Sequence, residues 1–400
     1  MLPLLGHVTT TPDATVEAIV TRTLELTAIP APTGDEGARA DAVAAGLAAA
    51  GLEVVHDEVG NVIGRAPGTD PQVPAIVVSA HLDTVFGAEE AVLARRDGDR
   101  LLGPGIGDNT VALAVLEVLA EDLAAAAGRS AHLVAGRSGD IPGAGADERS
   151  APARPGRAPA VPLVLVATVG EEGMGDLRGV KHLLRTMPVR GFVALEGHLL
   201  DSVVTGGIGA VRLRARHRGR GGHSWGDIGT PSAAHSLVRA CTAALDAVPA
   251  GRHVNLGVVR AGSTVNAIAE SAEVLVDLRD EDAERLERTV AVVVAALERA
   301  DRGVRAELER VGRRPAGRTP DDDPLVRAVR SARGDVGLPP VTEAAGSTEV
   351  NAAFPAGIPA ICVGVTRGGD MHRPSEWIEI PPIADGMAMV RALLRRLGAL

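Results

Sequence analysis

Tyrosine is absent from this chain of 400 residues, which contains only three phenylalanines and two tryptophans. Aromatic side chains form the platforms on which nucleic-acid bases stack and the cages that bind quaternary ammonium groups, so both kinds of site are nearly excluded. Basic residues are also outnumbered: 41 lysines and arginines face 51 aspartates and glutamates, a formal net charge of −10. This balance argues against a nucleic-acid partner.

Cysteine and long apolar runs are scarce as well. Cys241 and Cys362 are too few for a disulfide scaffold or a cysteine-built zinc site, and their apolar neighbours predict buried free thiols, as in a reducing cytosol. No run approaches the roughly 18 apolar residues of a membrane span, and the first residues do not resemble a secretory signal. We therefore expect a cytoplasmic protein without a membrane partner.

The length and the order of the patterns predict two domains of an α/β protein. A chain this long exceeds what one hydrophobic core usually serves. Apolar runs alternate with helical patterns, which predicts a catalytic domain with a mixed, largely parallel sheet flanked by helices, built from residues 1–203 and 316–400. Residues 204–315 instead suggest strand–helix–strand–strand–helix, an inserted α+β module of ferredoxin-like type.

Three local patterns complete this outline. Residues 124–160 are rich in Ala, Gly, Arg, Ser and Pro without sustained periodicity, so we expect a poorly ordered surface insertion with no part in the chemistry. Thr33 and Glu36 have the spacing of a capping box that opens a helix. Four arginines alternate with apolar residues between 211 and 218, which predicts a solvated strand face, with a patch for a substrate or partner as the alternative.

Polar residues stand at the ends of the predicted strands. Residues 163–169 read as a strand buried on both faces, and this strand leads into Glu171 and Glu172. Neighbouring side chains point in different directions, so the pair suits one metal ligand beside one general base; a solvated strand end is the alternative. Glu196 also ends a strand, and Asp108 lies in a glycine-rich loop before a helix, where a simple helix cap is the alternative.

Together these strand ends and loops contribute one constellation of polar side chains: His81, Asp83, Asp108, Glu171, Glu172, Glu196 and His372. Histidines and carboxylates without cysteine suit zinc, manganese or cobalt. One acid shared by two ions, with one histidine and one further acid for each ion, would give a two-metal site with ions about 3.5–4 Å apart. The remaining acid would then be free to move protons.

The motifs in chain order resemble those of the dizinc peptidases and deacylases that include peptidase T, carboxypeptidase G, aminoacylase and succinyl-diaminopimelate desuccinylase. The resemblance covers nearly the whole chain. It rests on these segments: Ser79–Val85, Gly103–Asn109, Gly170–Gly173, Leu195–Gly197, Gly221–Ser224, Gly346–Glu349 and His372. The chain departs from many relatives after the shared acid, where it has Asn109-Thr110-Val111, and after the last histidine, where it has Arg373-Pro374.

The resemblance implies a role for each ligand. Asp108 would bridge two divalent ions, zinc first with cobalt or manganese as alternatives. His81 and Glu196 would complete one ion, and Glu172 and His372 the other.

The resemblance also implies the other roles. Asp83 would orient the site, and Glu171 would be the general base that activates a water bridging the ions and then protonates the leaving amine. His223, on a lid that also forms a homodimer, would stabilise the oxyanion, in many relatives from the partner subunit. Asn266 and Arg279 would hold a substrate carboxylate, although for Arg279 an ion pair with a neighbouring aspartate is the alternative.

We therefore expect a metallopeptidase, a hydrolase that cleaves small peptides as a peptidase T-like aminopeptidase, dipeptidase or carboxypeptidase. An N-acyl-amino-acid deacylase with the same site (a deacetylase, desuccinylase or carbamoyl-amide hydrolase) is the first alternative. A metal-binding sensor or carrier without catalysis is the second, but binding alone needs neither Glu171 nor His223.

Overall fold

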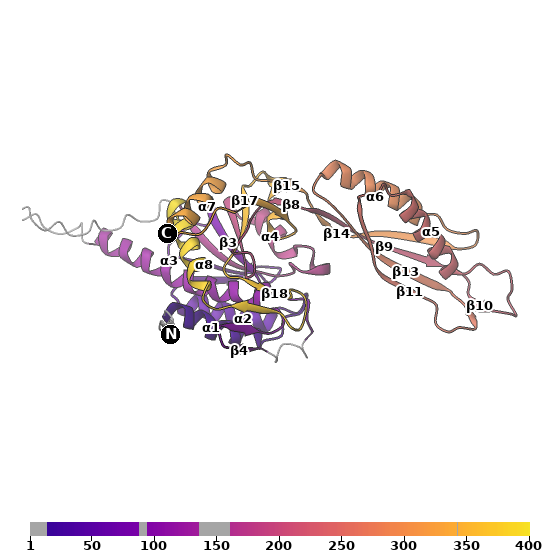
Figure 1. Ribbon diagram of the computed structural model, residues 1–400, viewed down its shortest axis with the longest axis horizontal. Helices are drawn as coiled ribbons and strands as arrows, with labels where there is room; N and C mark the ends of the chain where they lie inside the picture. The colour runs from indigo at the N-terminus through magenta and orange to yellow at the C-terminus, as the bar shows by residue number, and fades with distance from the viewer. Residues whose placement is uncertain (1–13, 88–93, 136–160, 342) are drawn as a thin grey trace, which may run out of the picture. The chain divides into compact units, whose positions relative to one another are not determined.

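The computed structural model describes residues 14–87, 94–135, 161–341 and 343–400 (Figure 1). The chain forms two compact units: unit 1 is Met1–Val203, Pro320–Glu343 and Ile358–Leu400, and unit 2 is Val204–Thr319 and Ala344–Gly357. Unit 2 starts at the residue where we expected the inserted domain to start. It ends later than residue 315, and it also takes in Ala344–Gly357, which the sequence had assigned to the larger domain.

The centre of unit 1 is a mixed sheet in which six strands follow the order β1-β2-β6-β3-β7-β17. Strands β6, β3, β7 and β17 are parallel, whereas β2 is antiparallel to β6 and β1 to β2. Their bounds are β1 Glu53–His56, β2 Val62–Arg65, β3 Ala75–His81, β6 Leu163–Thr168, β7 Val189–Glu196 and β17 Ala360–Gly364. Every residue of β3, β6 and β17 is buried, as expected for strands covered on both faces.

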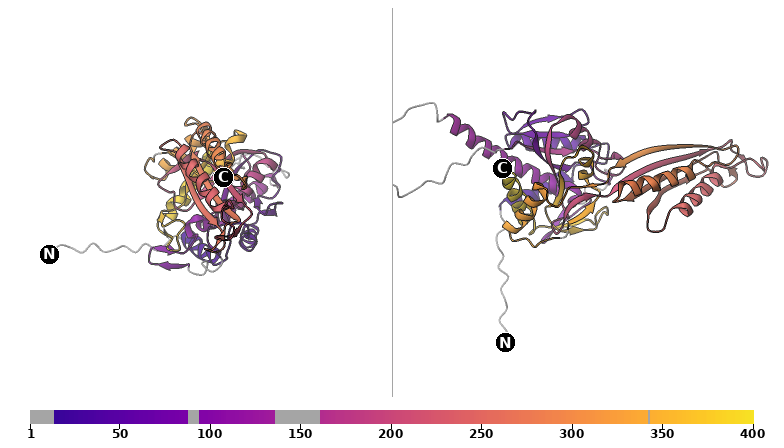
Figure 2. Two further views of the ribbon diagram at one scale, coloured as in Figure 1. Left: turned by 90° about the vertical axis from the view of Figure 1, so that its right-hand side faces the viewer. Right: turned by 90° about the horizontal axis from the view of Figure 1, so that it is seen from above.

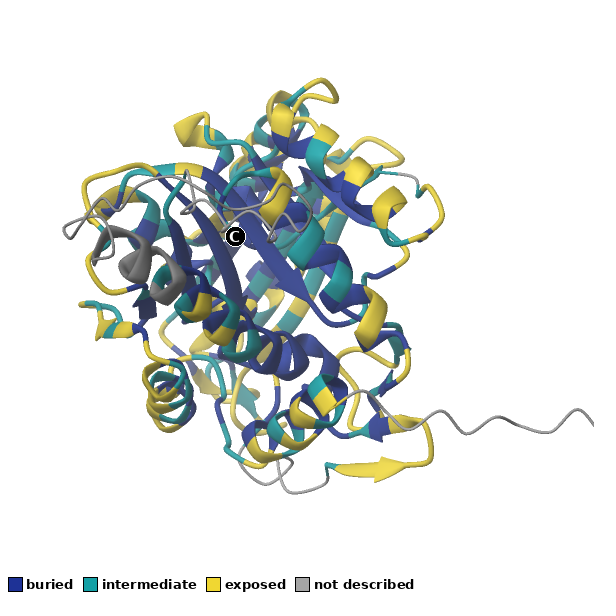
Figure 3. Ribbon diagram, turned by 90° about the vertical axis from the view of Figure 1, so that its left-hand side faces the viewer, coloured by how far each residue is buried: buried dark blue, intermediate teal, exposed yellow. Residues whose placement is uncertain are grey.

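Helices cover this sheet, and Figure 3 shows the buried strands in dark blue among helices with exposed outer faces. The helices are α1 Ala14–Thr27, α2 Gly37–Ala49, α3 Val111–Ala135, α4 Arg178–Thr186, α7 Pro324–Asp335 and α8 Ile383–Arg396. In α1 the buried apolar residues Val16, Ile19, Val20 and Leu26 recur at helical spacing and join the strands in one core. The α/β class with a mixed, largely parallel sheet is therefore confirmed.

A second, smaller antiparallel sheet of unit 1 has the order β18-β19-β5-β4. Its strands are β4 Arg95–Asp97, β5 Arg100–Leu102, β18 Gly368–Gly369 and β19 Trp377–Glu379. Trp377, the first residue of β19, pairs with Leu102, the last residue of β5. The segment that follows β5 therefore begins next to the loop that precedes β19. This sheet, which the sequence did not reveal, brings the loop of Asp108 next to the loop of His372.

Unit 2 contains a four-stranded antiparallel sheet in the order β11-β13-β9-β14. Its elements are β9 Gly209–Arg218, α5 Ala233–Ala247, β11 His253–Ala261, β13 Ser271–Asp280, α6 Ala283–Leu297 and β14 Arg305–Arg314. Both helices lie on one face, where apolar residues of β9 and β13 pack against them (Figure 2). The ferredoxin-like type is confirmed, and β14 adds a last strand that the sequence pattern had not predicted.

The other face of this sheet is charged, and its arginines are paired. Arg216 Nε lies 2.6 Å from Glu273 on β13, Arg214 Nη1 lies 3.2 Å from Glu309 on β14, and Arg212 Nε lies 3.3 Å from Asp277. Acids on both neighbouring strands thus neutralise the basic row of β9. The arrangement favours the expected solvated face over a basic patch for a partner.

The remaining elements are short. They are β8 Val203–Gly207, β10 Gly222–His223, β12 Ala267–Ile268, β15 Gly317–Arg318, β16 Glu343–Gly346, the 3-10 turns Gly173–Gly175, Glu349–Ala352 and Phe354–Ala356, and an irregular, kinked turn at Ile106–Thr110. Among the residues that the structure describes, no helix has the length and apolar character needed to cross a membrane. Cys241 and Cys362 are both buried free thiols, as predicted.

Two local predictions were wrong. Helix α3 continues to Ala135, so the first part of the expected insertion is helical; residues 136–160 lie outside the described residues. The capping box is absent, because no side chain caps the start of α2. Instead, the Thr33 hydroxyl donates to Asp83, and the Glu36 carboxylate accepts the backbone N–H of Gly170.

Candidate metal centre

The carboxyl ends of three adjacent strands hold most of the polar constellation. His81 is the last residue of β3 and Glu196 the last of β7, and Glu171 and Glu172 follow β6 closely. Because β6, β3 and β7 are parallel neighbours, their carboxyl ends meet at one edge of the sheet, where open α/β sheets hold their ligands.

Asp108 lies between two histidines. His81 Nε2 is 2.9 Å from Asp108 Oδ1, and His372 Nε2 is 3.0 Å from Asp108 Oδ2. Both carboxylate oxygens of Asp108 are thus engaged by imidazole rings, so this carboxylate is not the simple helix cap that the sequence allowed. Each of its oxygens faces a different histidine, which is the arrangement that an acid shared by two ions requires.

The ligand atoms form two groups that share Asp108. His81, Asp108 and Glu196 make one group and Asp108, Glu172 and His372 the other, with ligand atoms within 4.8 Å of one another in each group. Two ligands about 2.0–2.1 Å from a tetrahedral ion lie about 3.3 Å apart. His372 Nε2 is 3.3 Å from Glu172 Oε1, and His81 Nε2 is 3.9 Å from Glu196 Oε2. The spacing therefore fits two small divalent ions.

Glu172 gives independent support for a cation. Its Oε1 atom is buried and accepts no well-aligned hydrogen bond from the described residues, although His372 Nε2 lies 3.3 Å away as an ion-pair partner. Burial, with the nearby charges of Asp108 and Glu171, raises the pKa of the Glu172 carboxyl to about 7. A buried carboxylate oxygen without a hydrogen bond is costly, and a divalent ion would remove that cost.

The two histidines carry extra proton affinity. The hydrogen bond to Asp108 and the neighbouring carboxylate of Glu172 raise the pKa of His372 to about 10. Burial alone would lower the pKa of His81, but its hydrogen bonds to Asp108 and Asp83 raise it well above the ordinary value. Both rings thus hold protons at neutral pH without a metal, and an ion would displace these protons on binding.

Asp83 fixes the turn that carries the two glutamates. Its Oδ1 accepts the backbone N–H of Glu171 and its Oδ2 that of Glu172, both at 2.9 Å, and the Thr33 hydroxyl donates to Oδ2 at 2.8 Å. Burial would raise the pKa of Asp83, but these backbone donors and the neighbouring His81 outweigh it and lower that pKa. Asp83 therefore stays ionised and sets the direction of both glutamates.

Glu171 lies with the ligands. One of its carboxylate oxygens is within 4.8 Å of the ligand atoms of His81 and Glu172. All seven members of the predicted constellation are thus brought together in unit 1.

Sequence reasoning missed two residues of this site, Glu376 and His198. The Glu376 carboxylate is fully buried and accepts the backbone N–H of Asp108 at 2.9 Å, and His198 Nε2 lies 2.9 Å from the same carboxylate. One signal was available, since His198 stands two positions after Glu196 and Glu376 four positions after His372.

The other predicted residues lie in unit 2. His223 is on β10, and its Nδ1 accepts the backbone N–H of Trp225 and Gly226 at 3.2 and 3.1 Å. In the neutral ring the proton is therefore on Nε2, which leaves that nitrogen as a donor. Asn266 is close to it, since its carbonyl accepts the N–H of Ser224.

Arg279 has a different setting on β13. Its Nε donates to Asp277 Oδ2 at 2.7 Å, which is the ion pair that the sequence left open as an alternative. The surroundings of Arg279 do not by themselves assign it a substrate.

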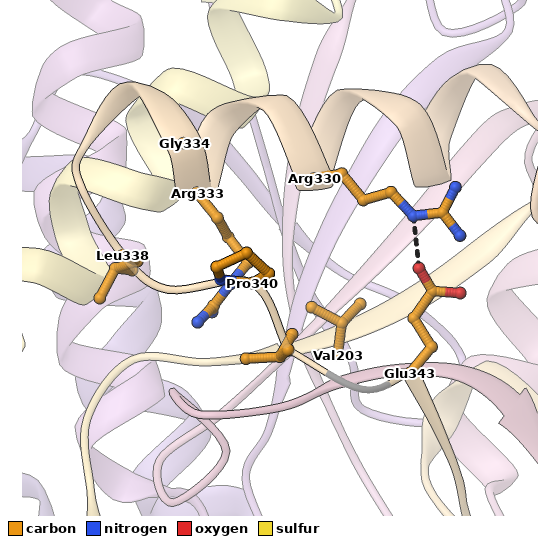
Figure 4. Close-up of a pocket in the computed structure, with 8 residues that line it drawn as sticks. Val203, Arg330, Arg333, Gly334, Leu338, Pro340 and Glu343 are labelled. Atoms are coloured by element: carbon orange, nitrogen blue, oxygen red, sulfur yellow. Dashed lines mark hydrogen bonds and ion pairs between the residues drawn. The ribbon is translucent and has the colours of Figure 1, made fainter.

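Unit 1 also contains a pocket of about 350 Å³ against α7 (Figure 4). None of its lining residues belongs to the metal constellation. The polar groups on its wall are engaged: Arg330 Nε donates to Glu343 at 2.6 Å, and the Arg333 guanidinium donates to the carbonyls of Leu200 and Pro339. The three charged side chains that line this pocket are thus already engaged with one another or with the backbone.

Two family models match the sequence. The model of peptidase family M20/M25/M40 matches residues 151–396, more than half of the chain, and that of peptidase family M28 matches residues 61–198. The uncharacterized protein YqjE of Bacillus subtilis (strain 168) is 26% identical over 246 residues, which are 58% of this chain and 64% of that protein. An N-carbamoyl-L-amino-acid amidohydrolase of Paenarthrobacter aurescens is 45% identical over 53 residues, 13% of each protein. The match thus spans less than two thirds of either relative.

The fold is found in solved structures too. The aminopeptidase PepT of Bacillus cereus superposes with a TM-score of 0.66 at 20% identity, covering 96% of this chain and 98% of that one. At this identity the likeness concerns the fold. The family match confirms the resemblance to the dizinc peptidases and deacylases. It also agrees with the expectation of a metal-dependent hydrolase. The chain belongs to peptidase family M20/M25/M40.

Proposed function

We propose that this protein hydrolyses the amide bond of small peptides with two divalent metal ions. The observation that carries the proposal is the position of Asp108, whose two oxygens face His81 at 2.9 Å and His372 at 3.0 Å. A single structural ion would need only one such face. His81 and Glu196 would complete one ion, and Glu172 and His372 the other.

Zinc suits these ligands best, with cobalt or manganese as alternatives, because the set combines imidazole with carboxylates and contains no thiolate. Two ions in such a site would lower the pKa of a bound water and would act as a Lewis acid toward the scissile carbonyl. The chain itself must then hold and move the proton.

Glu171 is the residue suited to that task. It is buried beside the ligands, and Asp83 fixes its backbone N–H at 2.9 Å, so its carboxylate has a set direction. The chain has no tyrosine to serve as an alternative acid. Glu171 would take a proton from water and deliver it to the nitrogen of the leaving amine.

Peptides are the first candidate substrates, since the matching family is one of peptidases and PepT, which shares the fold, is an aminopeptidase. N-acyl amino acids are the second. The short match to an N-carbamoyl-L-amino-acid amidohydrolase favours a carbamoyl compound among them. The homodimer, the cytoplasmic location and the substrate roles of Asn266, Arg279 and His223 stay predictions from the sequence.

The test is hydrolysis of a panel by the protein supplied with zinc, cobalt or manganese. The panel contains di- and tripeptides beside N-acetyl, N-succinyl and N-carbamoyl amino acids. Peptide cleavage that a chelator abolishes would support the proposal, and cleavage of N-acyl compounds alone would move the protein to the deacylases. If no compound of the panel is hydrolysed although two ions are bound per chain, the result would favour a non-catalytic metal-binding protein.

A variant pair tests the role of Glu171. Glu171→Ala should keep its fold and its metal content but lose nearly all turnover. Glu58→Ala, at an exposed loop position, should behave as the unmodified protein. Turnover near the original rate in Glu171→Ala would contradict the assignment.

A further inference from the structure

The Glu376 carboxylate is buried and is contacted by several hydrogen-bond donors. Its Oε2 accepts the N–H of Gly105 at 2.8 Å, and its Oε1 accepts those of Gly107 and Asp108, both at 2.9 Å. His198 Nε2 adds a fourth contact at 2.9 Å. A fully buried carboxylate would be very costly without such partners, so four of them at one group indicate a built arrangement.

The loop of Asp108 depends on this carboxylate in turn. Gly105 has a left-handed backbone (φ +72°), and this conformation helps to turn N–H groups of the loop toward one point. These groups are buried away from water, and buried N–H groups without an acceptor cost roughly 1–3 kcal/mol each. Glu376 is the acceptor that lets the loop keep this shape.

Glu376 also joins three segments that carry predicted ligands. It stands four positions after His372, in the loop between β18 and β19, and its own carbonyl accepts the N–H of Gly103 at 2.9 Å. Through His198 it reaches the segment of Glu196, two positions earlier. One carboxylate therefore connects the positions of Asp108, His372 and Glu196.

Glycines hold the His198 ring in place. A Cβ atom at Gly107 would overlap the ring, and one at Gly368 would lie 2.7 Å from its Nδ1. The N–H of Gly197 also donates to the carbonyl of Gly107 at 3.0 Å. The ring is thus fixed between two backbone segments with its Nε2 directed at Glu376.

We propose that Glu376, supported by His198, is a positioning residue that presets Asp108 to receive two metal ions. It acts on the metal site through Asp108 and takes no direct part in the reaction. The inference rests on the proposed function, because it presumes that the site binds ions.

The test measures metal binding and needs no substrate. Metal-free protein is dialysed against Co²⁺ at a series of free concentrations, and bound ions are counted and followed by visible absorption. In Glu376→Gln an NH₂ group replaces one oxygen, so at least one backbone N–H loses its acceptor. We expect the dissociation constant of the ions to rise about 10- to 100-fold with an altered Co²⁺ spectrum.

Glu117→Gln is the matched control. Glu117 is a largely buried carboxylate of unit 1 that pairs with Arg22 at 2.7 Å and lies outside the metal constellation. It should lose stability and keep both the metal affinity and the spectrum. If Glu376→Gln does not fold, a second pair of variants provides the test. His198→Leu removes the donor to Glu376 and should weaken metal binding. His198→Gln keeps an N–H donor and should bind metal almost as well as the unmodified protein.

The outcomes separate the two proposals. Folded Glu376→Gln with the original metal affinity and spectrum would overturn this inference alone. Equal weakening in Glu117→Gln would do the same, since the effect would then reflect general stability. If the unmodified protein bound no ions, the proposed function would fail and this inference with it.

Discussion

Asp83→Asn is a sharp perturbation of the site, because it changes one atom of a fully buried group. The Asp83 carboxylate accepts the N–H of Glu171 through one oxygen and that of Glu172 through the other, each at 2.9 Å. Asparagine has the same shape, but one of its two positions becomes an NH₂ group. Whichever way the amide turns, a donor then faces a backbone donor.

The magnitude follows from that conflict. One buried backbone N–H loses its charged acceptor and is left unsatisfied, which costs about 1–3 kcal/mol. The turn can relax to recover part of this energy, but relaxation moves Glu171 and Glu172. We therefore expect a lower melting temperature and a metal dissociation constant raised about 10- to 100-fold.

The assay is calorimetric titration of metal-free protein with zinc, beside a melting curve. Thr33→Val is the control, because it removes the hydroxyl that donates to the same carboxylate at 2.8 Å but leaves both backbone hydrogen bonds. It should cost only about 0.5–1.5 kcal/mol and leave the metal affinity within about threefold. Unchanged metal affinity in Asp83→Asn would refute the view that this carboxylate sets the position of the turn.

Three further predictions concern pH, the reaction and packing. The raised pKa of His372, about 10, stabilises the metal-free protein below pH 6.5 and ceases to do so as the pH rises toward 10. The metal needs the neutral ring, so the gap in melting temperature between metal-loaded and metal-free protein should widen from pH 6.5 to 9; a constant gap would contradict this. His223→Ala should lower kcat about 10²- to 10³-fold at unchanged metal content, and an unaltered kcat would remove its oxyanion role. Gly46→Ala places a methyl against the end of the Glu117 side chain, which must move away from Arg22 and so offsets part of the gain in helix propensity; Gly37→Ala in the same helix has open space, so Gly46→Ala should raise the free energy of unfolding in denaturant less than Gly37→Ala does, and equal gains would contradict this.

The sequence was most informative where local pattern and chemistry coincide. Apolar runs that end in His81 or Glu196 mark strand ends, and parallel strands bring such ends together without further information. The prediction of a capping box was wrong because Thr and Glu side chains can hydrogen-bond to distant segments as well as to the start of their own helix. Thr33 and Glu36 support the turn of Glu171 across the unit and leave the helix start uncapped.

Other features depend on contacts that spacing along the chain does not encode. Strand β14 is polar or charged at most positions and is held by its pairing with β9, so period-two alternation could not reveal it. Glu376 meets Gly105 and Asp108 from a position more than 260 residues away along the chain. The small sheet, in which Trp377 pairs with Leu102, brings these distant segments together.

The close fit of Gly107 against His198 has a consequence for how this sequence can diverge. Any side chain at position 107 would need the space that the imidazole fills, so the two positions cannot change independently. Homologues that carry a larger residue at 107 should also carry a smaller one at 198, and an alignment of many relatives should show the two columns changing together. Such lineages would have to hold their equivalent of Glu376 by some other donor.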